Sequence, residues 1–445
     1  MGALETIFKA YDIRGIYPDE LDEEGARRIG AAFVGFVATD RIVVGRDMRV
    51  SSPPLAQAFI DGATGAGATV TDVGEVSTDA LYFASGMLDM PGAMFTASHN
   101  PARYNGLKLC REKAAPIGEE SGLLEVRERA RTMTPSQRDS GRVERKDILV
   151  DYARHCRSLI DASKMRPLKI AVDAGNGMAG KTVPVVFEGL PVEIIPLYFE
   201  LDGTFPNHPA NPIEIENLVD LQKSVLEHAC DVGIAFDGDA DRMFLVDENA
   251  EPVSGSLTTA LVAERILRRD PGAHIIYNLI CSWTVREVIE ENGGIPVRSR
   301  VGHSFIKETM AETGAAFGGE HSGHYYFRDN FRADSGMIAA LFVLEAMSEK
   351  NTSLSQMMKP YQRYFDSGEI NSTVADQQAA LGRLAVRFSD GKQDFLDGLT
   401  VEYEDWWFNC RPSNTEPLLR LNLEARSESL KDEKVHEALD VIRGA

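Results

Sequence analysis

Three short apolar segments of this chain share one hydrophobic pattern, Gly-x-x-Phe, and each is followed at once by a polar loop. They cover residues 92–95, 233–236 and 314–317. A short apolar run bounded by polar residues is typical of a buried strand, and a repeated unit indicates related structural modules. Loops that follow neighbouring strands meet at one edge of a sheet. We therefore expect three related α/β units whose loops converge.

Around the first segment, the hydrophobic period alternates between helix and strand. The apolar positions of residues 23–37 fall on one helical face, residues 42–44 form a strand pattern, and a helical pattern follows Pro53 and Pro54. Residues 69–73 predict a further strand, and Thr78 is expected to cap the next helix. This alternation predicts an α/β domain with a largely parallel sheet. The strongly charged residues 113–146 predict an exposed helix and a linker.

The same alternation continues through the middle of the chain. A strand at residues 170–172 runs into a glycine-rich turn at residues 175–181. This turn can bind a phosphate or can simply let a helix pack close to the strand, and both interpretations stay open. Residues 243–246 and 251–253 predict a hairpin, and the apolar residues 335–348 predict a buried helix. Beyond residue 364, four predicted strands and two helices indicate a smaller α+β domain.

Length and charge narrow the function classes. A chain of 445 residues is too long for one core and indicates three or four domains of about 100–150 residues each. The net charge of -21 argues against nucleic acid and membrane surfaces as partners, because a phosphate backbone binds a basic face. A small anionic substrate stays possible, since a local cluster of arginine and lysine can form a positive pocket.

Cysteine usage and hydropathy point to the cytoplasm. The five cysteines are scattered without paired or metal-binding spacing, which is typical of reduced thiols. We find no N-terminal basic and apolar leader pattern and no apolar run near ~20 residues. We therefore expect a cytoplasmic protein that neither binds nor crosses a membrane.

The loop after the second segment carries the clearest chemistry. Asp237, Asp239 and Asp241 alternate along an extended loop, which turns their carboxylates to one side. Such crowding of like charge is usually relieved by a hard divalent cation, and Mg²⁺ is the commonest inside cells. A calcium-binding EF-hand does not fit, because Arg242 occupies the position of its obligatory glycine. A simple acidic turn remains the alternative. Arg242 suits a phosphoryl group bound beside the metal.

Three further loops carry polar groups. Ser98 follows the first segment, where its hydroxyl is either a held reactive group or part of a surface turn; its neighbours Ala97 and His99 do not form a hydrolase elbow. Glu320, Ser322 and His324 form a glycine-rich loop that suits a polyhydroxylated ligand or its own hydrogen-bonding network. Residues 411–417 are rich in donors that suit a phosphate.

Taken together, residues 96–101, 237–242, 319–324 and 411–417 resemble the four signature loops of the α-D-phosphohexomutases, in the order and spacing of that family. The chain resembles most the bacterial phosphomannomutase/phosphoglucomutase branch. The resemblance implies an α/β fold of four domains around a central cleft, three of related mixed α/β type and a C-terminal α+β domain with helices on a sheet. We expect the domains at residues 1–146, 147–248, 249–363 and 364–445.

The resemblance also implies a role for each matching residue. Ser98 would carry a phosphoryl group, and its phosphate would hold Mg²⁺ together with Asp237, Asp239 and Asp241. Arg242 would contact the transferred phosphate. Lys108 and His303 would line the cleft as further catalytic residues, with His303 a candidate proton carrier. The residues that would bind the substrate are Tyr11, Arg14, Glu320, Ser322, His324, Arg411, Ser413, Asn414 and Thr415.

We therefore expect a phosphosugar mutase that interconverts hexose 6-phosphate and hexose 1-phosphate through a hexose 1,6-bisphosphate. Mannose is the expected substrate, with glucose second. Phosphoglucosamine mutase and a Mg²⁺-dependent sugar phosphatase stay open as alternatives, and so does a binding module without catalysis. Two departures from the family touch specificity: His321 in the third loop, and the lack of a lysine near Ile280 and Cys281. A monomer and a homodimer are both compatible with the sequence.

Overall fold

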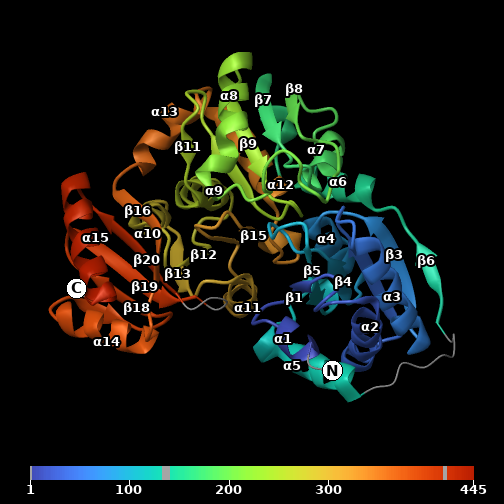
Figure 1. Cartoon of the computed structure of the whole chain (residues 1–445). Coiled ribbons are helices and arrows are strands. Elements are labelled where there is room, and N and C mark those ends of the chain that lie inside the picture. The colour runs from blue at the N-terminus through green and yellow to red at the C-terminus, as the bar shows by residue number, and fades with distance from the viewer. Residues whose placement is uncertain (1–2, 133–140, 414–417, 445) are drawn as a thin grey trace.

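The computed structural model describes residues 3–132, 141–413 and 418–444. Figure 1 shows four domains that follow one another in an arc, from the blue N-terminal domain to the red C-terminal domain. Four separate sheets correspond to these domains, of six, five, four and five strands. Among the described residues, no helix combines the length and the apolar character that crossing a membrane requires. All five cysteines are buried and free.

The first sheet has the strand order β1-β5-β4-β2-β3-β6. Its centre is parallel, as the sequence predicts, while β5 and β1 run antiparallel at one edge. The strands are β1 (Ile13–Ile16), β2 (Arg41–Arg46), β3 (Thr69–Glu75), β4 (Gly92–Phe95), β5 (Tyr104–Cys110) and β6 (Val143–Arg145), and the helices are α1 (Ala3–Ile7), α2 (Glu23–Val37), α3 (Ser52–Gly65), α4 (Thr78–Leu88) and α5 (Leu124–Thr132). The charged stretch predicted as helix and linker contains α5, and it also supplies β6, which pairs with β3.

The second sheet has the order β11-β10-β9-β7-β8, and the predicted hairpin is its β10–β11 edge. Its elements are β7 (Leu168–Asp173), β8 (Val192–Leu197), β9 (Val232–Phe236), β10 (Met243–Val246), β11 (Pro252–Val253), α6 (Leu149–Ser158), α7 (Ala179–Val186) and α8 (Val219–His228). Since β11 pairs with β10, the second sheet extends beyond residue 248. The domain boundaries given above stay proposals.

The third sheet has the order β13-β12-β14-β15. Its elements are β12 (His274–Asn278), β13 (Ile295–Ser299), β14 (Phe317–Gly319), β15 (Tyr325–Phe327), α9 (Gly255–Arg269), α10 (Trp283–Glu291), α11 (His303–Thr313), α12 (Gly336–Lys350) and α13 (Leu354–Met358). The strand expected at residues 314–317 begins only at Phe317. Gly314 instead ends α11 in the left-handed conformation, with φ 68°, which glycine adopts without steric cost.

The fourth sheet is antiparallel, in the order β16-β20-β19-β18-β17. Its elements are β16 (Phe365–Thr373), β17 (Lys392–Asp394), β18 (Leu399–Glu402), β19 (Trp406–Pro412), β20 (Leu418–Ala425), α14 (Gln377–Arg387) and α15 (Glu428–Arg443). The two helices share a separate apolar core with this sheet, and Figure 1 shows them together on its outer side. The short β17 was not predicted from the sequence, because its three residues are polar.

One apolar core joins the first three domains. It contains Phe83 of the first domain, Phe236 of the second and Phe317 of the third. The helix α12 lies within it and is buried from Gly336 to Ser348, as its largely apolar sequence predicts. Interiors packed in this way deform little. The loops at the ends of β4 and β9 are therefore held in a fixed relation.

Candidate active site

Ser98 lies in the loop that follows β4 and is 5% exposed. Its Oγ donates to Oδ2 of Asp237 over 2.6 Å and accepts from Nη2 of Arg242 over 3.1 Å. Nδ1 of His99 lies 3.2 Å from the same oxygen. The backbone at Ser98 is left-handed, with φ 47°, an uncommon conformation for a residue with a Cβ. The hydroxyl is therefore held at the junction of two domains, and the surface-turn interpretation is not favoured.

The acidic loop follows β9 directly. Carboxylate oxygens of Asp237, Asp239 and Asp241 lie within 4.8 Å of one another, and all three residues are buried. Lys108 on β5 places Nζ 2.8 Å from Asp239 and 2.5 Å from Asp241. Arg242 pairs with Asp237 at 3.0 Å. Three buried carboxylates thus face two cations, which leaves one negative charge without a compensating partner in this group.

Burial and charge divide these carboxyl groups. Burial raises the pKa of Asp237 to about 8, against the attraction of Arg242 and with the repulsion of Asp239. Burial also disfavours the charge of Asp239, but the ammonium of Lys108 outweighs it and holds the pKa of Asp239 below its usual range. The loop therefore binds either a proton or a further cation near neutral pH.

The free lone pairs of this loop suit a metal. Oδ1 of Asp239 and Oδ1 of Asp241 are buried and accept no hydrogen bond. Buried carboxylate oxygens without donors are costly unless a cation compensates them. A hard divalent cation with oxygen ligands fits this donor set. The acidic cluster can therefore bind a metal ion.

Glu320 comes directly after β14 and is 2% exposed. Its Oε1 accepts from Nδ2 of Asn278 over 3.1 Å and from the backbone N–H of Gly302 over 3.2 Å. Its Oε2 accepts from the hydroxyl of Tyr326 over 2.7 Å. These three donors lie outside the third loop, on β12, before α11 and on β15, and they fix the Glu320 carboxylate in one orientation.

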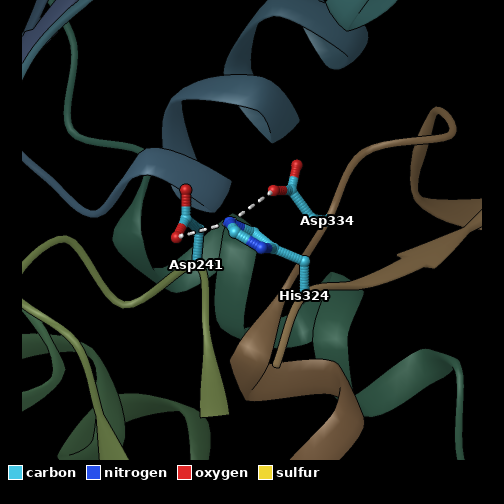
Figure 2. A group of neighbouring side chains, drawn as sticks. All are labelled: Asp241, His324 and Asp334. Atoms are coloured by element: carbon cyan, nitrogen blue, oxygen red, sulfur yellow. Dashed lines mark ion pairs between the residues drawn. The ribbon is translucent and has the colours of Figure 1, made fainter. Parts of the chain in front are cut away.

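His324 connects the third loop to the acidic loop. Its Nδ1 lies 3.2 Å from Oγ of Ser322 and 3.5 Å from Oε2 of Glu320. Figure 2 shows its ring between Asp241 and Asp334. Nε2 of His324 lies 3.6 Å from Oδ1 of Asp241 and 3.9 Å from Oδ2 of Asp334. These three residues form a second group whose ligand atoms lie within 4.8 Å of one another. Ser98, Lys108, the acidic loop and His324 are thus one continuous polar cluster.

Tyr11 and Arg14 border this cluster on the first domain. Nη1 of Arg14 donates to the carbonyl of Ala97 over 3.3 Å, and its guanidinium also binds the side chains of Asp12 and Asn100. The hydroxyl of Tyr11 donates to the carbonyl of Val301 over 3.2 Å. Val301 precedes α11, which begins at His303. The side chain of His303 lies outside the described part of the structure.

Arg411 and Ser413 lie at the end of β19 in the fourth domain. Nη2 of Arg411 donates to Glu369 over 2.9 Å, and Oγ of Ser413 accepts from Arg420 over 3.3 Å. Burial raises the pKa of Tyr11, and the positive charge of nearby Arg411 opposes part of this rise. No hydrogen bond among the described residues links Arg411 to Ser98. Asn414 and Thr415 lie outside the described residues.

Some functional contacts were not apparent in the sequence. Thr78 does not act as the N-cap of α4; that position belongs to Ser77. Instead the hydroxyl of Thr78 donates to Oδ2 of Asp239 over 2.6 Å. Arg49, which follows β2, binds the loop of Ser98. The one signal for Arg49 in the sequence is that Asp47 and Arg49 form a charged pair directly after the buried strand β2, which ends at the same sheet edge as the strand before Ser98.

The glycine-rich turn after β7 supports the acidic loop. The N–H of Met178 donates to the carbonyl of Gly238 over 2.9 Å. A Cβ at Gly177 would lie 2.6 Å from that carbonyl oxygen, so no larger residue fits without displacement. Lys181 binds the carbonyl of Glu75 over 2.6 Å. These contacts favour the tight-turn interpretation over phosphate binding.

Ser98, the three aspartates with Arg242, and His324 bring the loops of the first three domains together in one cluster, an arrangement that suits an enzyme of phosphoryl transfer. Comparison with known families matches phosphoglucomutase/phosphomannomutase alpha/beta/alpha domain I at residues 5–134, domain II at 150–251, domain III at 254–364 and the C-terminal domain at 369–441. The chain belongs to the phosphoglucomutase/phosphomannomutase family. It is a phosphohexose mutase, which is an isomerase.

Individual relatives match over nearly the whole chain. The chain is 40% identical over 447 residues to a protein of Xanthomonas campestris named "Phosphohexose mutases", covering 98% of this chain and 99% of that one. It is 41% identical over 454 residues to a phosphomannomutase of Escherichia coli, with the same coverage of 98% and 99%. The crystal structure of a phosphoglucomutase/phosphomannomutase family protein from Burkholderia thailandensis superposes with a TM-score of 0.88, at 33% identity over 98% of this chain and 97% of that one.

Proposed function

We propose that this chain moves a phosphoryl group between the 6- and 1-positions of mannose, with glucose as a second substrate, and that Ser98 carries the group. Relatives from Escherichia coli and Vibrio cholerae that are 41% and 40% identical carry the name phosphomannomutase. The observation that carries the proposal is the position of Ser98 Oγ, which lies 2.6 Å from Asp237 and 3.1 Å from Arg242.

The reaction needs two transfers in opposite directions. In the first, the bond from phosphorus to Ser98 Oγ breaks and Oγ takes up a proton, while a bond from phosphorus to the 1-hydroxyl oxygen of hexose 6-phosphate forms and that hydroxyl gives its proton to a base of the chain. The resulting 1,6-bisphosphate turns around in the site. In the second, the bond from phosphorus to the 6-oxygen breaks and a bond from phosphorus to Ser98 Oγ forms; the Ser98 hydroxyl gives up its proton, and the 6-oxygen takes up a proton to leave hexose 1-phosphate. Arg242 neutralises charge on the transferring group.

The metal is proposed as Mg²⁺, held by Asp237, Asp239 and Asp241 together with the phosphate on Ser98. When bound, it would supply positive charge to the phosphoryl oxygens. Lys108 already compensates Asp239 and Asp241. We therefore assign Lys108 to the balance of charge around the transfer, and His303 to proton transfer.

The remaining residues would bind and orient the sugar phosphate. Glu320 would accept hydrogen bonds from sugar hydroxyls, and Ser322 would donate to them, with His324 beside both. Tyr11 and Arg14 would border the sugar. The phosphate that is not transferred would bind the fourth-domain loop of Arg411, Ser413, Asn414 and Thr415. Binding energy from this distant phosphate can be used to orient the reacting end.

A substrate panel tests the proposal. Purified protein is assayed with Mg²⁺ and a trace of hexose 1,6-bisphosphate on the 1-phosphates of mannose, glucose and glucosamine, with free phosphate measured in parallel. We expect 6-phosphate formation from mannose first and glucose second. Preference for glucosamine 1-phosphate would identify a phosphoglucosamine mutase, and stoichiometric free phosphate would identify a phosphatase.

We place the protein in the cytoplasm, working as a monomer or homodimer on a small-molecule phosphosugar. The proposal is supported by the five buried thiols, which carry no disulfide.

A further inference from the structure

Arg49 is a buried arginine that binds the backbone of the Ser98 loop. It follows β2, is 1% exposed and donates four hydrogen bonds to carbonyl oxygens. Nη2 donates to Ser98 over 2.8 Å and to Asn100 over 2.7 Å. Nη1 donates to Pro101 and to Tyr104, both over 3.0 Å. One guanidinium thus binds four carbonyl oxygens of the segment 98–104.

We propose that Arg49 is the positioning residue for the phosphoryl carrier. The inference rests on the proposed function of Ser98. Each of these four contacts ends on a backbone oxygen, so Arg49 acts on the loop and not on the reacting Oγ. Its role is to set where that Oγ lies.

The conformation of Ser98 needs such a hold. Its φ of 47° is left-handed, and a residue with a Cβ leaves that region unless its surroundings fix it. The N–H of Ser98 donates to Oγ1 of Thr96 over 2.9 Å, and its carbonyl accepts from Arg49. A Cβ at Gly238 would lie 2.5 Å from the same carbonyl oxygen, so the acidic loop packs against it closely. Arg49 therefore fixes Ser98 at the point where the first two domains meet.

The guanidinium is itself immobilised. Oδ2 of Asp47 lies 3.2 Å from Nε, and Oδ1 of Asp47 accepts from Oγ of Ser52 over 2.5 Å. The ring of Phe205, from the second domain, lies 5.0 Å from Cζ. A planar fork with five N–H groups can serve several carbonyls at once, whereas a lysine ammonium is a single point of charge with three donors. Lysine at this position would keep the positive charge but could not donate to all four carbonyl oxygens at once.

Arg49→Lys tests the inference, with Arg265→Lys as the matched control. Arg265 is also buried, at 4% exposed, but it pairs with Glu345 and Glu349 on α12. The parent is measured first: if it neither isomerises the sugar phosphate nor acquires phosphate on Ser98 from mannose 1,6-bisphosphate, the proposed function fails and not this inference alone.

With an active parent, we expect Arg49→Lys to lower kcat and the rate of Ser98 phosphorylation by about 100-fold, the cost of misplacing a reacting group by about 1 Å, with KM within about threefold. Arg265→Lys should keep kcat within about threefold of the parent, even if its thermal unfolding midpoint falls as far as that of Arg49→Lys. Equal kcat values for the two folded variants would overturn the inference, because a purely structural role predicts that result.

Asp47→Asn decides the matter if Arg49→Lys does not fold. It keeps the guanidinium and replaces one carboxylate oxygen by an amide nitrogen, which removes the charge and the acceptor that orient Nε. We expect kcat to fall by about tenfold with KM unchanged. A folded Asp47→Asn variant with the kcat and Ser98 phosphorylation rate of the parent would overturn the inference.

Discussion

The hydroxyl of Ser98 lies 2.6 Å from a carboxylate oxygen of Asp237, although 139 positions separate the two residues in the sequence. A phosphate on Ser98 would add about -1.5 to -2 charge at this point. The three aspartates already exceed the charge of Lys108 and Arg242. A phosphate on Ser98 would therefore require a further cation when all three aspartates are ionised, and this contact would couple the proposed serine chemistry to the proposed metal site.

Removal of the metal should abolish turnover. We expect chelation by EDTA to stop the mutase reaction and added Mg²⁺ to restore it, because the acidic loop needs a cation to hold a phosphate. Asp239→Ala should lose activity and also lose the rise in unfolding temperature that Mg²⁺ gives the parent. Asp220→Ala, an exposed aspartate of the same domain, serves as the control. Full activity of Asp239→Ala without added metal would contradict the assignment.

Loss of the fourth-domain arginine should impair both binding and orientation. For Arg411→Ala we expect KM to rise and kcat to fall, each by about tenfold, since the distant phosphate supplies binding energy that orients the reacting end. The measurement is steady-state kinetics with mannose 1-phosphate. Arg387→Ala, on the exposed face of α14 in the same domain, should leave both constants unchanged. Parental kinetics for Arg411→Ala would exclude the phosphate-binding role.

A buried carboxylate at the junction of three domains should make stability depend on pH. Asp79 accepts from Ser77 over 2.5 Å, from Ser335 over 2.6 Å and from the hydroxyl of Tyr152. Burial raises the pKa of Asp79 to about 6 from 3.8, against the effect of these hydroxyls. The folded state therefore binds this proton more tightly than the unfolded state, and the contribution to stability is lost as the pH rises from about 4 to about 6.

Asp79→Asn tests this dependence by denaturant unfolding between pH 4 and pH 7.5. The stability of the parent relative to the variant should fall by about 3 kcal/mol across that range, as expected for a shift of about two pKa units. A constant difference between the two proteins would show that Asp79 titrates normally. Asp151→Asn, which pairs on the exposed face of α6, is the control.

The loop of Ser98 and the acidic loop were predictable because each follows a strand with a clear apolar pattern. Asp237, Asp239 and Asp241 were recognisable from their spacing, and Ser98 from its place after β4. The pairing of Lys108 with Asp239 and Asp241 was not predictable in this way, because it depends on how β5 faces another domain. Arg49 and Thr78 were also missed, because their partners are far away in the sequence. Arg49 binds backbone carbonyls of the Ser98 loop, and Thr78 binds the carboxylate of Asp239.

Local signals also gave two different outcomes for similar patterns. Gly233 lies within β9, whereas Gly314 ends α11, although both begin a Gly-x-x-Phe segment. A single glycine is compatible with a strand and with a left-handed helix end, and tertiary packing decides between them. The polar strands β6 and β17 likewise form because a neighbouring strand offers its edge.

The most direct test of the central claim is the phosphorylation of Ser98 during turnover. Intact-mass and peptide mass spectrometry are applied to the parent and to Ser98→Ala after incubation with Mg²⁺, mannose 1-phosphate and a hexose 1,6-bisphosphate. We predict that the parent carries one phosphate on Ser98 and that the folded Ser98→Ala variant carries none and loses most of its mutase activity. An active parent without phosphate on Ser98, or a Ser98→Ala variant that isomerises mannose 1-phosphate at close to the parental rate, would contradict the account.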